Sequence, residues 1–201
     1  FAFISGIINV KYFDSATQII FVLISITLIE ELLNYVISIR TGQKAPIYHI
    51  YSAIEIFLTT IYFLKTIKFK YYRIGVVMSV LIWPSFGLLN IIYFQPINVI
   101  NTNMLVLESI MIIIMALYGL YRIFINDSIH KPTQLPEFWI WTLFLMYWSS
   151  SFFFWGFFKI FHFKNQHYFN LTAYSFQEIV NIIAYVGIGL TFYYYPKMTK
   201  Y

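Results

Sequence analysis

The sequence SATQIIFVLISITLIEELLNYVISI, residues 15–39, decides the fold class of this chain. It contains no Lys or Arg, and it is long enough for a helix that crosses a bilayer, which needs about 20 residues. The same bias extends through the chain, because 60% of the 201 residues are hydrophobic and 10% are charged. A soluble domain carries about 25% charged residues. The composition therefore predicts an integral membrane protein.

Further apolar runs, each bounded by charge or proline, predict further membrane-spanning helices. The complete predicted spans are Ser15–Ile39, Pro46–Leu64, Ile74–Phe94, Asn103–Phe124, Glu137–Phe158 and Phe169–Tyr195. Phe1–Val10 is too short to span and begins without methionine, so we expect the end of a truncated first helix. The alternative is an interfacial or signal-like segment. The sequence thus predicts an all-α membrane protein, a single domain over residues 1–201 with about seven transmembrane helices.

The basic residues predict the orientation of these helices, because Lys and Arg are enriched in cytoplasmic loops. Nine of the 13 fall on one side: Lys11, Lys65, Lys68, Lys70, Arg73, Arg122, Lys131, Lys197 and Lys200. The other side carries Arg40, Lys44, Lys159 and Lys164. We therefore expect the C-terminus in the cytoplasm and the N-terminus outside. The net charge of +5 indicates lipid head groups as partners and not nucleic acid.

Most of the acidic residues lie inside the apolar stretches: Glu30, Glu31, Glu55, Glu108 and Glu178. A carboxylate at membrane depth costs ~2.5–3.5 kcal/mol on insertion scales and usually faces a cavity or a partner. Counted from the outer end of each helix at ~1.5 Å per residue, four of them fall ~12–14 Å below the boundary, and Glu108 lies slightly higher. The pattern predicts a polar layer at one depth.

Helical spacing places polar side chains beside these carboxylates, because residues three or four apart share a helix face. One face carries Tyr48, Ser52, Glu55, Thr59 and Tyr62, and another carries Tyr174, Glu178, Asn181 and Tyr185. Trp148 lies at mid-span, where it either packs or lines a pocket and stacks on a cation. The candidate residues for binding a ligand or ion are therefore Glu30, Glu31, Asn34, Tyr51, Glu55, Asn90, Glu108, Trp148, Tyr174, Glu178 and Asn181.

Three classes of function fit this pattern. The first is an outward-opening polar pocket for a cation, a proton or a small polar ligand, used in transport or sensing. The second is a structural or accessory subunit of a larger membrane complex, with the Glu, Asn and Tyr side chains joining helices. The third is an intramembrane hydrolase with a metal held by His49, His162 and His167. We expect these histidines to be loop or interfacial residues instead, because no catalytic motif accompanies them and no cofactor is indicated.

The segment Pro46-Ile-Tyr-His-Ile-Tyr-Ser-Ala-Ile-Glu55 resembles one in a family of small bacterial polytopic membrane proteins. Members carry Tyr-x-x-Tyr-x-x-x-Glu at the start of one helix, after a helix with an embedded Glu. Tyr48, Tyr51, Glu55 and Glu30 match that pattern. The resemblance implies a bacterial inner (cytoplasmic) membrane location and no known activity. The expected partners are the bilayer with either a small polar or cationic ligand or other membrane subunits.

Overall fold

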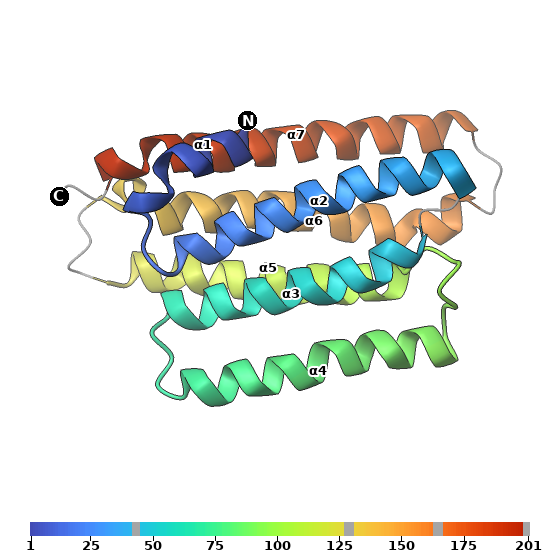
Figure 1. Cartoon of the computed structure of the whole chain (residues 1–201), viewed down its shortest axis with the longest axis horizontal. Coiled ribbons are helices and arrows are strands. Elements are labelled where there is room, and N and C mark those ends of the chain that lie inside the picture. The colour runs from blue at the N-terminus through green and yellow to red at the C-terminus, as the bar shows by residue number, and fades with distance from the viewer. Residues whose placement is uncertain (42–44, 127–130, 163–166, 199–201) are drawn as a thin grey trace. The chain divides into compact units, whose positions relative to one another are not determined.

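The structure is a computed structural model, and it describes residues 1–41, 45–126, 131–162 and 167–198 (Figure 1). The regular structure of these residues is entirely helical, as the sequence predicts. The helices are α1 (Ala2–Asn9), α2 (Thr17–Thr41), α3 (Ala45–Thr66), α4 (Tyr72–Tyr93), α5 (Thr102–Phe124), α6 (Pro136–His162) and α7 (His167–Met198), with two short 3-10 turns, η1 (Val10–Tyr12) and η2 (Pro132–Gln134).

Five segments of these helices are long and apolar enough to cross a membrane: Thr17–Arg40, Ile47–Thr66, Tyr72–Tyr93, Thr102–Phe124 and Tyr174–Met198. They lie within a few residues of the predicted spans. The helix α6 has the necessary length, but its serines and its Trp and Tyr side chains are less hydropathic than Ile or Leu. The helix α1 has 8 residues and is too short to span. The chain therefore has the helices of a multi-pass membrane protein, while the count of seven spans stays a prediction.

Polar side chains satisfy the free backbone N–H groups where two of the helices begin. The Asp14 carboxylate accepts a hydrogen bond from the Thr17 N–H at 2.9 Å and so caps α2. The Gln95 Oε1 accepts one from the Asn103 N–H at 2.9 Å at the start of α5. Such caps satisfy donors that the first helical turn leaves without a partner. They stabilise the starts of α2 and α5.

Residues Phe13–Met104 form one compact unit, in which α3 packs between α2 and α4 (Figure 1). The helix α4 buries a row spaced by three or four residues: Ser79, Trp83, Gly87 and Asn90. The indole Nε1 of Trp83 donates to the hydroxyl of Thr60 in α3 at 3.1 Å. These contacts fix which faces of α3 point toward α4.

Residues Phe1–Tyr12 and Leu105–Tyr201 form the second unit, in which α7 packs against both α6 and the short α1 (Figure 1). Small residues permit the close contacts, as is usual between membrane helices. A Cβ at Gly119 of α5 would lie 2.6 Å from Nε1 of Trp141 in α6. A Cβ at Gly189 of α7 would lie 2.5 Å from the ring of Phe1. Glycine at these points brings the helices together.

Candidate functional site

Two of the predicted glutamates lie together in the unit formed by Phe13–Met104. Glu30 of α2 and Glu55 of α3 are close enough for their carboxylates to interact electrostatically. The Tyr51 hydroxyl donates a hydrogen bond to the Glu55 carboxylate from one turn earlier in the same helix. The same hydroxyl lies 2.6 Å from Oγ1 of Thr27 in α2. Thr27, Tyr51, Glu55 and Glu30 thus form one polar cluster across the α2–α3 contact.

Asn34 extends this cluster along α2, as its spacing from Glu30 predicts. Its Nδ2 donates a hydrogen bond to Oε1 of Glu30, and the Asn34 side chain is 2% exposed. Its Oδ1 is also buried and has no hydrogen-bond partner among the residues that the structure describes. An amide oxygen in this position is an acceptor available to a hydrogen-bond donor or a cation.

Glu31 follows Glu30 directly in the sequence but does not join it. Glu30 is 5% exposed, whereas Glu31 lies on the exposed side of α2. Successive helical residues are separated by about 100° around the axis, so only one of two adjacent glutamates can turn toward α3. Glu30 therefore faces Glu55, and Glu31 does not.

A second polar cluster lies where α3 begins. The Nε2 of His49 lies 2.8 Å from the carbonyl oxygen of Val99. Because a carbonyl oxygen can only accept a hydrogen bond, Nε2 carries the hydrogen and donates it. The Nδ2 of Asn101 donates to Oγ of Ser52 at 2.9 Å. Both His49 and Asn101 are buried. These bonds attach the segment before α5 to α3, one turn from Glu55.

Asn90 belongs to this end of the unit and bonds to groups other than the glutamates. Its Oδ1 accepts a hydrogen bond from Nδ2 of Asn103 at 3.3 Å, and its Nδ2 donates to Oε1 of Gln95 at 3.4 Å. The Nε2 of Gln95 in turn donates to the Thr102 hydroxyl at 2.7 Å. In the structure, Asn90 therefore holds the connection between α4 and α5, a role that its spacing along α4 did not indicate.

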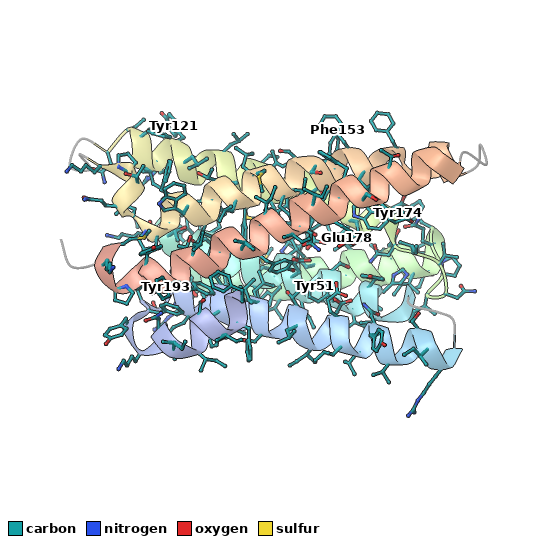
Figure 2. The ribbon with its side chains drawn as sticks, turned by 90° about the horizontal axis from the view of Figure 1, so that it is seen from above. Tyr51, Tyr121, Phe153, Tyr174, Glu178 and Tyr193 are labelled. Atoms are coloured by element: carbon teal, nitrogen blue, oxygen red, sulfur yellow. The ribbon has the colours of Figure 1, made fainter. Side chains whose placement is uncertain are left out.

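The remaining candidates lie in the other unit. Glu108 of α5 is fully buried, whereas Glu178 and Tyr174 of α7, both labelled in Figure 2, are exposed. Asn181 is half-buried, and its Oδ1 has no hydrogen-bond partner within the described part of the chain. Trp148 is 4% exposed and packs edge-on against Tyr147 at 5.2 Å between ring centroids. The ring contact with Tyr147 is local to α6, so a role of Trp148 in packing or in contacting a ligand stays a prediction.

One polar contact in this unit was missed by the sequence reasoning. The hydroxyl of Ser150 donates to Oε1 of Gln177 at 2.9 Å, and Nε2 of Gln177 donates to the hydroxyl of Ser151 at 2.8 Å. The serines and Gln177 carry no charge, and Gln177 stands beside the more conspicuous Glu178. Thr27 and Asn101 were also missed. The position of Thr27 three residues before Glu30 was a signal for it.

A metal centre receives no support from the described residues. They contain no group of three or more His, Asp or Glu side chains that could hold a metal ion. His49 donates to Val99, as described above. His162 ends α6 and His167 begins α7, but their side chains lie outside what the structure describes.

Comparison of the chain with known protein families, with curated proteins and with solved structures gave no match. The resemblance carried by Tyr48, Tyr51 and Glu55 therefore stays a prediction. The functional argument rests on the residues of the chain itself.

Proposed function

We propose that the chain is a membrane protein whose Glu30–Glu55 pair binds a proton or a small monovalent cation for transport or sensing. The observation that carries this proposal is that two carboxylates, on adjacent helices that are each long and apolar enough to span a membrane, lie near enough to repel one another. Like charges at short range disfavour one another, and burial within a membrane adds to the cost. A positive charge shared between the carboxylates removes that repulsion.

The surrounding groups suit such a site. Tyr51 donates to the Glu55 carboxylate and Asn34 to that of Glu30, so neutral donors orient both carboxylates of the pair. The Oδ1 of Asn34 supplies a neutral oxygen beside Glu30. Oxygen ligands of this kind suit hard cations. In the orientation that the basic residues predict, the α3 end at Ala45 faces outward, so a proton or cation from outside would reach the pair from that end.

The test is infrared difference spectroscopy of the purified protein in lipid, with pH or sodium concentration as the variable. Glu30→Gln and Glu55→Gln should each remove a carboxyl band that responds to protons or sodium. The matched control is Glu31→Gln, which changes the adjacent exposed carboxylate in α2 and should leave that band in place. The proposal is wrong if the pair variants keep the wild-type spectrum, or if Glu31→Gln alters it equally.

The alternative function is an accessory subunit of a larger membrane complex, and the position of Glu178 favours it. Glu178 is exposed on α7, with the exposed apolar residues Phe176, Ile179 and Ile182 around it. A carboxylate among apolar side chains at membrane depth needs a donor or cation from elsewhere, and a partner helix supplies one. A stoichiometric membrane partner that is lost in Glu178→Gln and kept in Glu31→Gln would support this function over the first.

A further inference from the structure

The polar face of α3 continues beyond the carboxylate pair toward the end of the helix at Thr66. Thr59, Tyr62 and Thr66 follow Glu55 at intervals of four, three and four residues, which places them on one helix face. Thr59 is 1% exposed and Tyr62 is 0% exposed. At ~1.5 Å per residue this face extends ~16 Å from Glu55 to Thr66. It provides a row of hydroxyl groups, buried at Thr59 and Tyr62 and half-buried at Thr66, that leads from the pair to one end of the span.

The hydroxyl of Thr59 differs from the other threonine hydroxyls of the membrane-spanning helices. Such groups commonly donate to the carbonyl four residues earlier, as Thr60 and Thr191 do at 2.7 and 2.9 Å. The Thr59 Oγ1 is buried and has no hydrogen-bond partner among the residues described. On the other side of Glu55, by contrast, the Ser52 hydroxyl accepts from Asn101. The Thr59 hydroxyl is therefore available as both donor and acceptor to water.

We propose that Thr59 and Tyr62 form a proton relay between the Glu30–Glu55 pair and the Thr66 end of α3. This inference rests on the proposed function of the pair as a proton site. Side chains one helical turn apart have Cβ atoms ~5–6 Å apart, farther than the ~2.7–2.8 Å of an O–H···O bond. A water molecule in each gap completes the chain of hydrogen bonds.

The transfer leaves every group in the relay unchanged. The pair releases its shared proton to the first water, while that water passes one of its own hydrogens to Oγ1 of Thr59. Thr59 passes its hydroxyl hydrogen onward, and the water before Tyr62 and the Tyr62 hydroxyl repeat the step. Rotation of the hydroxyls then restores the starting arrangement. One proton has moved from the carboxylate pair to the Thr66 end, and the pair carries one more negative charge until it is reprotonated.

This arrangement assigns the proton as the transported species. A sodium or potassium ion needs several oxygen ligands at each position along its path, whereas this face offers one hydroxyl per turn. Proton transfer requires only a continuous chain of hydrogen bonds.

The test uses the purified full chain in liposomes, with proton flux followed by an enclosed pH-sensitive dye under an imposed potassium-diffusion potential. Thr59→Val removes the hydroxyl at nearly constant volume and should lower the flux about tenfold, the factor that corresponds to losing one hydrogen bond of ordinary strength. Thr59→Ser keeps a hydroxyl and should retain flux. Thr60→Val is the matched control, because the Thr60 hydroxyl contacts Ile56 and Trp83 on another face and should leave flux near wild type.

Several results would overturn the relay. Wild-type liposomes without proton flux, equal losses in Thr59→Val and Thr60→Val, or an unchanged Thr59→Val would each do so. Tyr62→Phe provides a second variant if Thr59→Val does not fold, and its wild-type flux would likewise contradict the relay. The failure of the proposed function is distinct, because Glu55→Gln would then leave the carboxyl band unchanged. If Glu55→Gln removes the carboxyl band but Thr59→Val retains wild-type proton flux, the relay is wrong and the proposed function of the pair still stands.

Discussion

At the scale of single residues, orientation decides what each polar group can do. Glu30 and Glu31 are chemically identical neighbours, yet one is buried beside Glu55 and the other is exposed. Thr59 and Thr60 show the same contrast, since only Thr60 bonds to its own helix and to Trp83. The rotation of about 100° per residue separates the two members of each pair. A substitution of Glu31 is therefore a control for the same substitution of Glu30, and one of Thr60 is a control for one of Thr59.

A prediction at this scale concerns Gly119 of α5. A Cβ there would lie 2.6–2.8 Å from three ring atoms of Trp141, whose indole is 1% exposed. A rigid buried ring cannot move aside cheaply, so Gly119→Ala should lower stability by about 1–3 kcal/mol, as overpacking does. The measurement is thermal unfolding of the purified protein in detergent.

The matched control for Gly119 is Gly156→Ala in α6. A Cβ at Gly156 meets nothing within 4 Å, so this variant should be neutral or stabilised by about 0.5–1 kcal/mol, the ordinary gain of alanine over glycine in a helix. Equal unfolding temperatures for the two variants would show that the α5–α6 contact does not require glycine at position 119.

At the scale of helices, membrane helices associate through close packing and interhelical hydrogen bonds, because the lipid tails remove most of the hydrophobic driving force. The contact between α6 and α7 uses both. Gln177 exchanges hydrogen bonds with Ser150 and Ser151, and a Cβ at Gly187 would lie 2.5 Å from Leu143. Gln177 is therefore a structural residue, although it adjoins an exposed glutamate.

Gln177→Leu should destabilise the helical unit by about 1–2 kcal/mol, because it removes two interhelical hydrogen bonds that average about 0.6 kcal/mol each and leaves serine hydroxyls without their partner. Glu178→Gln is the control, and it should stay near wild type. Denaturant-induced unfolding in mixed micelles measures both. A loss in Glu178→Gln equal to that in Gln177→Leu would contradict the assignment of Gln177 as the residue that joins α6 and α7.

At the scale of the whole molecule, orientation in the bilayer follows from the distribution of basic residues and not from any single contact. The turn between α3 and α4 carries Lys68 and Lys70, and the first turn of α4 carries Arg73. The segment between α4 and α5, by contrast, carries no charge from Gln95 to Thr102. Basic loops are retained on the cytoplasmic side. The two ends of α4 therefore differ in a way that predicts its direction.

The absence of cysteine from the chain permits a direct test of this orientation. Cysteine placed at the exposed positions Lys68 and Ile97, in Lys68→Cys and Ile97→Cys, should react from opposite sides with a membrane-impermeant maleimide. We expect Ile97→Cys to react in intact cells and Lys68→Cys only after permeabilisation, while Ile82→Cys at mid-helix should stay unreactive. The reverse pattern for the first two would place the Ala45 end of α3 on the cytoplasmic side.

The sequence by itself determined the helical class and the bounds of the long helices to within a few residues, because hydropathy over about 20 residues is a local property. It also placed Asn34 beside Glu30 and Tyr51 beside Glu55, since i to i+4 neighbours follow from the helix alone. Local geometry was sufficient for these contacts. The depth of each glutamate below the outer end of its helix could likewise be predicted from the number of residues between them.

Only the tertiary structure decided which side of each helix meets another helix. The choice of Glu30 over Glu31, the contact of Thr27 with Tyr51, and the bonding of Asn90 to Gln95 and Asn103 all depend on it. The physical reason is that a helix with long apolar faces has no strong internal preference for one rotation about its axis in lipid. That rotation is set by small residues and hydrogen-bond partners on neighbouring helices, which lie far away in the sequence.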